Sequence, residues 1–389
     1  MAAAIINVRT ADDPRDAIHR AVQALAEGKL VAVPTETVYG VAASALNEEA
    51  VARLSRLKQR AADQPFTLAI KSADDARDYV PCIPAIGERL ARRCWPGPVT
   101  LVVDSDHPDS LLKQLPDSVQ QAVCPQGTLG LRVPAHEVVL AVARLTAGPL
   151  VLTSANRRGR PEANSSEEVA AALGDEIDLI LDDGPSKFGQ PSSVVRAGSD
   201  GLKLLRSGVI NEQALSRLAG YILVFVCTGN TCRSPMAEAL MRRRVAEHLK
   251  CSIADLEEQG VMIVSAGIAA HAGDRASLES AQVVKERGLD LSSHESQPLG
   301  ERLVRFADLV LTLTRGHREA IVGQWPDAAE RVKLLCGDGS NVADPIGGPI
   351  ELYRRCADQI DANLGAWLDE IDFSSLPPGN PTDSEGSGA

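Results

Sequence analysis

Residues 221–249 read YILVFVCTGNTCRSPMAEALMRRRVAEHL and indicate a strand, a loop and a helix in succession. The run Tyr221–Val226 is wholly apolar, as is typical of a strand that is buried on both faces of a parallel sheet. Farther on, Met236, Leu240 and Val245 recur among charged residues, which predicts an amphipathic helix. We therefore expect a doubly wound α/β domain with a parallel sheet in this half of the chain.

The loop between this strand and this helix runs from Cys227 to Arg233 and resembles an anion-binding nest. Five residues separate the cysteine from the arginine, so consecutive backbone N–H groups can converge on one tetrahedral anion at the helix N-terminus. The same field stabilises a thiolate, and the guanidinium offers a planar fork for two phosphate oxygens. Glycine and asparagine tolerate the positive φ that a tight nest needs. We expect the loop to be formed or organised by Thr228, Gly229, Asn230, Thr231, Cys232 and Ser234.

Asp344 is the candidate general acid for this loop, and it lies in the Pro- and Gly-rich segment Val342–Gly348. The sequence predicts that Cys227 accepts a phosphoryl group while Asp344 protonates the leaving atom, and that Asp344 then activates water. We expect no metal or other cofactor in this reaction. If the Cys–Arg spacing stood alone, the simpler interpretation would be that Cys227 is a buried cysteine at the end of a strand. The strand, the helix and the Asp-Pro pair favour the catalytic interpretation.

The string VCTGNTCRSP closely resembles the low-molecular-weight protein phosphatase family, and the resemblance runs from about Tyr221 to Asp372. Further matches are segments 264–267 (VSAG) and 288–294 (GLDLSSH). By position, the resemblance implies three catalytic residues: Cys227 as the nucleophile, Arg233 as the phosphate clamp and Asp344 as the general acid.

Two positions depart from the tyrosine-specific members of that family. Thr231 stands where those members usually carry a bulkier aliphatic residue, and threonine there resembles the bacterial protein-arginine phosphatases. Ile346 stands where an aromatic residue would help to line the substrate slot. A phosphoprotein carrying phosphoarginine is therefore a candidate substrate beside one carrying phosphotyrosine. Cys232 resembles the family's second loop cysteine, which can trap oxidised Cys227 as a disulfide, although simple packing in the loop is an equal alternative.

The N-terminal half carries a second set of motifs around short apolar runs. A helical stretch, Ala17–Ala26, precedes the strand Leu30–Val33, and the hydroxyl-rich turn PTETVYG follows at residues 34–40. Two cations flank one residue in the segment Lys58–Arg60, and a hydroxyl- and amide-bearing loop follows an apolar run at Thr153–Asn156. Such groups are suited to holding phosphate oxygens. Two arginines beside strand-like runs complete the set: Arg132 and Arg206.

Together these motifs resemble the YrdC-like threonylcarbamoyl-AMP synthase family over about residues 10–210. Segments 95–98 (WPGP), 131–134 (LRVP) and 192–195 (SSVV) also match that family. The resemblance implies a twisted mixed sheet. It also implies that L-threonine, bicarbonate and ATP, with Mg²⁺, give threonylcarbamoyl-AMP and pyrophosphate. Because that product is used to modify adenosine beside the tRNA anticodon, the tRNA threonylcarbamoyl-transfer machinery is an implied partner.

The same resemblance assigns site residues by position. ATP contacts are implied for Lys58, Arg60, Thr128, Ser154, Asn156 and Arg206. Threonine contacts are implied for Thr35, Arg132 and Ser192, with no metal-ligand set in the protein. Two positions depart from the family, namely Ala69, where a histidine can contact the amino acid, and Ala61, where proline is common. The first departure bears on threonine selectivity.

Composition limits the class of protein. The chain has 389 residues, 44% of them hydrophobic and 24% charged, as is typical of a soluble globular protein of two or three domains. No apolar run approaches the roughly 18 residues that a membrane span needs, and the first residues do not resemble a secretory signal. Eight cysteines are too sparse for a disulfide scaffold, so we expect a cytoplasmic protein without membrane contact.

We expect a synthase-like domain at residues 1–210, a short helical linker at 211–220, a phosphatase domain at 221–372 and a disordered tail at 373–389. A bifunctional enzyme is the favoured hypothesis. The alternatives are a nucleotide- or RNA-binding module that targets an active phosphatase, and a scaffold without activity. The net charge of −12 disfavours general RNA binding. An arsenate reductase would need resolving cysteines beyond the nucleophile, and the stretch Gln297–Arg318 has none.

Overall fold

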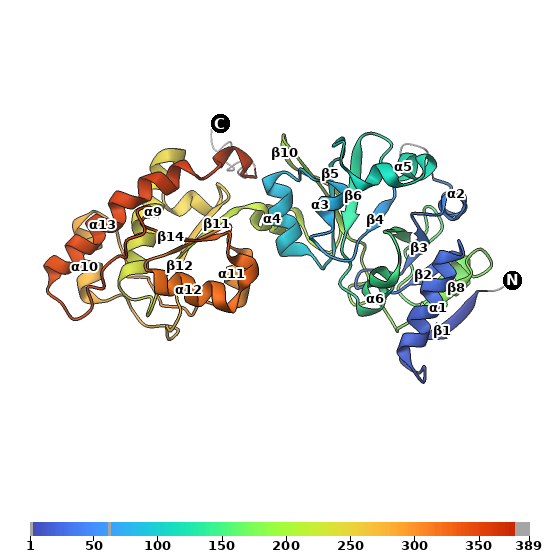
Figure 1. The fold of residues 1–389 in the computed structure, drawn as a ribbon, viewed down its shortest axis with the longest axis horizontal. Coiled ribbons are helices and arrows are strands. Elements are labelled where there is room, and N and C mark those ends of the chain that lie inside the picture. Colours follow the sequence, from blue (N-terminus) through green and yellow to red (C-terminus); the bar gives the residue numbers. More distant parts are fainter. Residues whose placement is uncertain (1–2, 61–63, 378–389) are drawn as a thin grey trace, which may run out of the picture. The chain divides into compact units, whose positions relative to one another are not determined.

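The computed structural model describes residues 3–60 and 64–377. They form two compact α/β units, and the chain passes from the first unit to the second between Leu218 and Ala219 (Figure 1). The helix α8 (Glu212–Ala219) occupies the segment for which a helical linker is predicted, and nearly all of it belongs to the N-terminal unit. Ala61, one of the departures from the family pattern, lies outside the described residues.

The N-terminal unit is built on a ten-stranded sheet in which four strand pairs are parallel and five are antiparallel. This confirms the predicted mixed sheet. In spatial order the strands are β1 (Ala4–Asn7), β8 (Leu179–Asp182), β2 (Val31–Val33), β3 (Gly40–Ser44), β7 (Leu150–Ser154), β4 (Thr67–Ala69), β6 (Thr128–Arg132), β5 (Val99–Asp104), β9 (Ser193–Gly198) and β10 (Gly201–Arg206).

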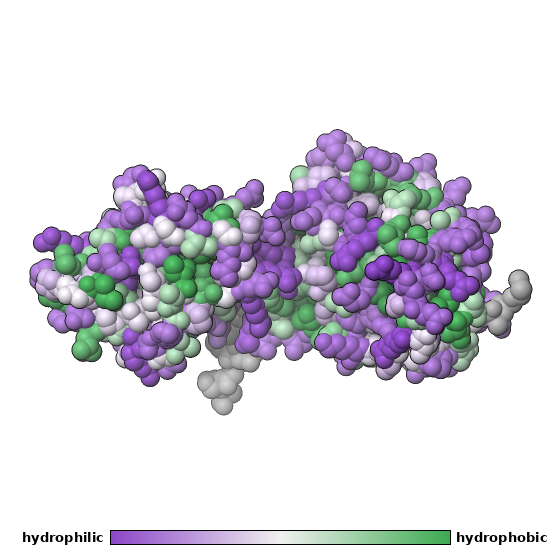
Figure 2. Space-filling view, turned by 60° about the horizontal axis from the view of Figure 1, so that its bottom comes forward, coloured by the Kyte–Doolittle hydropathy of each residue, from purple (hydrophilic) through white to green (hydrophobic). Residues whose placement is uncertain are grey.

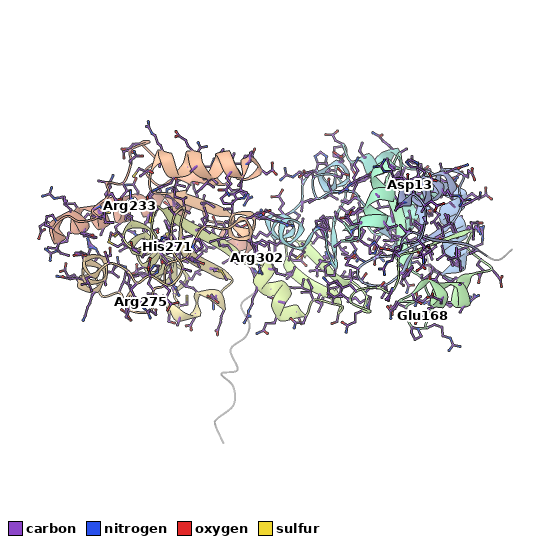
Figure 3. The ribbon with its side chains drawn as sticks, turned by 90° about the horizontal axis from the view of Figure 1, so that it is seen from below. Asp13, Glu168, Arg233, His271, Arg275 and Arg302 are labelled. Atoms are coloured by element: carbon purple, nitrogen blue, oxygen red, sulfur yellow. The ribbon has the colours of Figure 1, made fainter. Side chains whose placement is uncertain are left out.

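Helices pack against this sheet through apolar faces. The first helix begins at Pro14 because Asp13, labelled in Figure 3, caps it by accepting a hydrogen bond from the Arg15 backbone N at 2.9 Å. Leu25 on this helix and Val139 are fully buried in one core with Val31 and Val33. The helices are α1 (Pro14–Ala26), α2 (Glu48–Leu57), α3 (Ala76–Tyr79), α4 (Ala85–Cys94), α5 (Asp117–Val123), α6 (Glu137–Leu145) and α7 (Ser166–Leu173), with a 3₁₀ turn at Leu111–Gln114.

The C-terminal unit contains a four-stranded sheet, and its three strand pairs are all parallel, as predicted. Alternate residues of its central strand enter two cores. Phe225 packs with Leu240 on one face, whereas Val224 packs with Ile321 on the other. Helices therefore cover both faces, which gives the doubly wound architecture. The strands in spatial order are β12 (Val261–Gly267), β11 (Tyr221–Cys227), β13 (Leu309–Thr312) and β14 (Val332–Leu334).

The helices of this unit end in a short turn that the sequence did not predict. Residues 373–377 are not disordered: Phe373–Ser375 form a 3₁₀ turn, and the Phe373 ring stacks on His248 at 4.4 Å. Leu376 packs against the same core. The rest of the predicted tail, 378–389, lies outside the described residues. The helices are α9 (Arg233–Leu249), α10 (Leu278–Glu286), α11 (Glu301–Phe306), α12 (Arg315–Gln324) and α13 (Ile350–Asp369), with 3₁₀ turns at Ala254–Glu257 and Pro326–Ala328.

On the face drawn in Figure 2, hydrophobic side chains form small patches that hydrophilic residues separate. Across residues 3–60 and 64–377, no helix has the length and apolar character to cross a membrane.

Candidate active sites

The Cys227–Arg233 loop lies at the carboxyl end of β11, directly before α9. The next strand in sequence, β12, lies on one side of β11, and the one after it, β13, lies on the other. Open α/β sheets bind ligands at such a reversal of strand order. Cys227 is buried, its Sγ lies 3.0 Å from the Ser234 Oγ, and the Asn230 backbone N donates to it at 3.3 Å. The sulfur therefore has two neighbours that can stabilise a thiolate.

Asn230 organises the loop from a left-handed backbone conformation with a φ of +56°. Its Nδ2 donates to the Ser234 Oγ at 3.0 Å and to the Ser265 Oγ at 2.8 Å. Its Oδ1 accepts from the Gln297 backbone N at 2.9 Å, and its carbonyl accepts from the His294 Nε2 at 2.8 Å. Asparagine is one of the few residues that adopt this conformation readily. Asn230 thus joins the surroundings of Cys227 to two distant segments, one at Ser265 and one at residues 294–297.

Gly229 does not adopt a positive φ, contrary to our expectation. The glycine that the loop requires is instead Gly267 at the end of β12. A Cβ atom at Gly267 would lie 2.4 Å from the Thr228 carbonyl oxygen, so only glycine allows this strand to approach the loop so closely.

A layer of polar residues behind the loop was not predicted. The Ser265 Oγ donates to the Glu238 Oε2 at 2.7 Å, and the Gln297 Nε2 donates to the Ser265 carbonyl at 2.9 Å. Through Asn230 these side chains form one continuous network that reaches Cys227. They lie on different segments with no shared spacing, so a single sequence gives no signal for the network.

Arg233 and Asp344 are brought together directly. The Arg233 Nη2 donates to the Asp344 Oδ2 at 2.5 Å, and its Nη1 donates to the Val342 carbonyl at 3.3 Å. Its Nε is buried and has no hydrogen-bond partner among the residues that the structure describes. Arg233, labelled in Figure 3, thus offers Nε at once and Nη2 after Asp344 moves. An Nε–Nη2 pair can bind two phosphate oxygens.

Thr228 contacts a histidine that the sequence did not identify. The His317 Nε2 lies 3.0 Å from the Thr228 Oγ1, and the His317 Nδ1 is buried without a partner in the described part of the chain. Burial, and then the nearby Arg233 charge, lower the pKa of His317 to about 4. The imidazole is therefore neutral near pH 7 and adds no positive charge to the site.

The remaining predicted positions line the edge of the site. The Thr231 Oγ1 lies 3.7 Å from the Cys232 Sγ, and Cys232 is buried with its sulfur 4.0 Å from the Tyr353 Oη. Ile346 is 70% exposed. The predicted disulfide between Cys232 and oxidised Cys227 stays a prediction, since both thiols are free.

In the N-terminal unit, the predicted residues converge on one cavity of about 240 Å³. Eight of the nine predicted ligand contacts line it: Thr35, Lys58, Arg60, Arg132, Ser154, Asn156, Ser192 and Arg206. Thr128 is not among the lining residues, and it lies four positions before Arg132 at the other end of β6. Its contact with the nucleotide stays a prediction.

Lys58 forms the centre of one polar corner of this cavity. Its Nζ donates to the Ser154 carbonyl at 3.0 Å, and to the Asn156 carbonyl at 2.5 Å and Oδ1 at 2.6 Å. Burial, and then the Arg60 charge, lower the pKa of Lys58 to about 8. These groups therefore form one hydrogen-bonded cluster, although about 100 residues separate them in sequence.

Two further cations, Arg60 and Arg206, are partly buried and close to other positive charges, which disfavours their charged forms. Burial and then Arg206 lower the pKa of Arg60 to about 10, and burial also lowers the pKa of Arg206. The Arg206 Nη2 donates to the Ser192 carbonyl at 2.8 Å, and the Arg60 guanidinium lies 4.2 Å from the Phe66 ring centroid. Partly desolvated cations that repel each other favour a polyanionic ligand, because the ligand relieves the repulsion.

Arg132 is already engaged by the protein. Its Nη2 donates to the Glu36 Oε1 at 2.7 Å and to the Thr37 Oγ1 at 2.8 Å, and its Nε donates to the Gly97 carbonyl at 3.3 Å. Glu36 was not predicted, although it lies within the PTETVYG turn. The Glu36 carboxylate orients the guanidinium, so a threonine carboxylate would meet an arginine of fixed direction.

Ala69 does not line the cavity. It is fully buried in the core on β4, while Thr67, two positions earlier on the same strand face, does line the cavity. Other lining residues that the sequence did not single out are Gln64, Thr100 and Arg158. No carboxylate is among the described residues that line this cavity. Within residues 3–60 and 64–377, no group of His, Cys, Asp and Glu is arranged to hold a metal ion.

Comparison with known protein families gives one match for each unit. The Sua5/YciO/YrdC family, described as telomere recombination, matches residues 23–208. The low molecular weight phosphotyrosine protein phosphatase family matches residues 222–375.

Individual relatives belong to both families. A threonylcarbamoyl-AMP synthase from Pyrococcus abyssi is 36% identical over 220 residues, which are 57% of this chain and 62% of the relative. The chain thus spans less than two thirds of that relative's length. A protein-arginine-phosphatase from Geobacillus stearothermophilus is 37% identical over 155 residues, 39% of this chain and 96% of the relative. The solved structure of a Sua5 double mutant from P. abyssi aligns with 85% of this chain and 98% of its own, with 26% identity and a TM-score of 0.50.

Proposed function

Because the chain belongs to the Sua5/YciO/YrdC family through its N-terminal unit and to the low-molecular-weight phosphatase family through its C-terminal unit, we propose that it is a bifunctional enzyme. The N-terminal site makes threonylcarbamoyl-AMP from ATP, bicarbonate and L-threonine. The C-terminal site removes phosphoryl groups from a phosphoprotein with a cysteine nucleophile.

The observation that carries the phosphatase activity is the placement of the Cys227 Sγ against Ser234 and the Asn230 backbone N, with Arg233 beside them. In the first step a P–S bond forms, the bond from phosphorus to the leaving atom breaks, and Asp344 gives that atom its proton. In the second step Asp344 takes a proton from water, which attacks phosphorus and releases Cys227. Hydrolysis that persists in Cys227→Ser would refute this mechanism.

Phosphoarginine is the substrate that we favour over phosphotyrosine. Thr231 at the edge of the site is short, and the relative that matches most of this unit is named a protein-arginine-phosphatase. The Asp344 carboxylate, which already binds one guanidinium, can also face the guanidinium of a phosphoarginine. Parallel kcat/KM measurements on phosphoarginine and phosphotyrosine peptides of one sequence test this preference.

The synthase activity rests on the cavity that Lys58, Arg60 and Arg206 share with polar groups. These cations support binding of the ATP triphosphate, while Arg132 and Thr35 support binding of threonine. Catalysis then consists of holding the carbamate against the α-phosphate, because no side chain need form a covalent bond. Mg²⁺ would enter with ATP, since the described lining residues offer hydroxyls and cations but no carboxylate, and it would share the triphosphate charge.

Pyrophosphate release tests the synthase directly. The proposal requires release that depends on threonine as well as on ATP and bicarbonate. Release without threonine dependence, or nucleotide binding alone, would favour the alternative of a nucleotide- or RNA-binding module. We further propose that the product feeds the tRNA threonylcarbamoyl-transfer machinery, and that the thiolate of Cys227 works in a reducing cytoplasm.

A further inference from the structure

Exposed large hydrophobic side chains of the C-terminal unit are concentrated around the Cys227–Arg233 loop. The described part of this unit has five such side chains, and four of them lie on segments that bound the loop. Single exposed apolar residues are ordinary, but their concentration at one site is not. We call these four residues the apolar rim: Ile268, Leu278, Ile346 and Leu352.

Backbone hydrogen bonds connect three of the rim residues, or the residue before them, to the site. The backbone N of Ile268 donates to the Cys227 carbonyl at 3.0 Å, and the backbone N of Ile346 donates to the Asp344 Oδ1 at 3.3 Å. Leu278 follows Ser277, whose backbone N donates to the carbonyl of Thr231 in the loop at 2.9 Å.

The fourth rim residue, Leu352, lies in the first turn of α13 and folds back over the Asp344 loop. A Cβ atom built at Gly348 would lie 2.5 Å from the Leu352 Cδ1. The rim residues therefore come from three stretches of the chain, at Ile268, at Leu278 and at residues 346–352, and not from one strand or helix.

We propose that the apolar rim binds apolar side chains that flank the phosphorylated residue in the protein substrate. This inference rests on the proposed phosphatase activity. A phosphoryl group seated between Cys227 and Arg233 would bring the residues on either side of it close to the segments that carry the rim. Leu278 is 86% exposed at the first position of α10, where the Ser277 cap leaves its side chain without a structural task. Burial of such side chains by a peptide removes apolar surface from water and strengthens binding.

The test compares variants on two kinds of substrate. Leu278→Ser and Leu352→Ser should each lower kcat/KM about fivefold for a phosphoarginine peptide with leucines on both sides of the phosphoarginine. Neither should change kcat/KM for the same peptide with serines at those positions, or for p-nitrophenyl phosphate. Leu278→Met keeps a large apolar side chain and should therefore retain the wild-type kcat/KM. Phosphotyrosine peptides with the same flanks, measured in parallel, keep the test independent of the phosphorylated residue.

Met262→Ser is the matched control. Met262 is the fifth exposed hydrophobic residue of this unit, and it lies five residues before the loop end of β12, about 16 Å away at about 3.3 Å per residue. Met262→Ser should leave kcat/KM unchanged for the leucine-flanked peptide, the serine-flanked peptide and p-nitrophenyl phosphate.

Each other outcome overturns the proposal. Equal losses of kcat/KM on leucine- and serine-flanked peptides would mean that Leu278 and Leu352 affect the active site itself and do not bind the flanking residues of the substrate. Unchanged hydrolysis together with a loss of self-association in sedimentation would make the rim a contact between copies of this chain. No hydrolysis of p-nitrophenyl phosphate by the wild-type chain would instead refute the phosphatase activity itself.

Discussion

Replacement of Asn230 tests how much this residue stabilises the Cys227–Arg233 loop. The Asn230 side chain makes three hydrogen bonds, two buried ones to Ser234 and Ser265 and a partly buried one to Gln297. At about 1 kcal/mol each, their loss in Asn230→Ala costs about 3 kcal/mol of the free energy of unfolding of the C-terminal unit. Alanine in a left-handed conformation adds about 1 kcal/mol. Asn230→Gly loses the same hydrogen bonds without that backbone strain, so it should be about 1 kcal/mol more stable than Asn230→Ala.

Hydrogen exchange of strand β13 measures this effect in the C-terminal unit alone. Amides of Leu309–Thr312 lie in the interior of the sheet, between β11 and β14, and exchange when the unit opens. We expect exchange to accelerate about 1,000-fold in Asn230→Ala, and about fivefold less than that in Asn230→Gly. Amides of β7 in the N-terminal unit provide the internal control and should not change.

Two results would refute this reasoning. Equal exchange rates in the alanine and glycine variants would show that the positive φ of Asn230 carries no strain. An acceleration below about threefold in both variants would show that the three hydrogen bonds contribute little to stability.

Three other predictions follow from individual contacts. Asp344→Asn should raise affinity for inorganic phosphate about fivefold in calorimetry, because Arg233 Nη2 no longer binds a carboxylate; the gain is limited because the Asp344 side chain is 43% exposed. The lowered pKa of Lys58, about 8, means that its charge is lost as pH rises through 8, so ATP affinity should fall up to about tenfold between pH 7 and 9, and Lys58→Arg should abolish this dependence. His317, with a pKa of about 4, should show no imidazole NMR titration between pH 8 and about 5.5, whereas a pKa near 6.5 would contradict its burial beside Arg233.

Much of both sites follows from the sequence, because their residues lie in short motifs. The apolar run Tyr221–Val226 and the loop after it are local features, and such features fix a strand, a turn and a nest without knowledge of the rest of the chain. The PTETVYG turn and Lys58–Arg60 are likewise local patterns, and residues of both line the same cavity.

The parts that were missed depend on long-range contacts. Glu238, Ser265 and His317 act through hydrogen bonds to residues that are 27 to 89 positions away. The Glu36–Arg132 ion pair spans 96 positions. The tail prediction failed at Phe373 for the same reason, since its partner His248 lies on another helix. A polar or aromatic residue with a distant partner cannot be distinguished from an ordinary surface residue in one sequence.

The central claim is that one chain holds two active sites, and one experiment tests it. The full-length chain and its Cys227→Ser variant are assayed side by side for threonine-dependent pyrophosphate release and for phosphate release from a phosphoarginine peptide. We predict that the variant loses phosphate release and retains pyrophosphate release at the wild-type rate. Phosphate release that survives in the variant, or pyrophosphate release that is absent from the wild-type chain, would contradict the account.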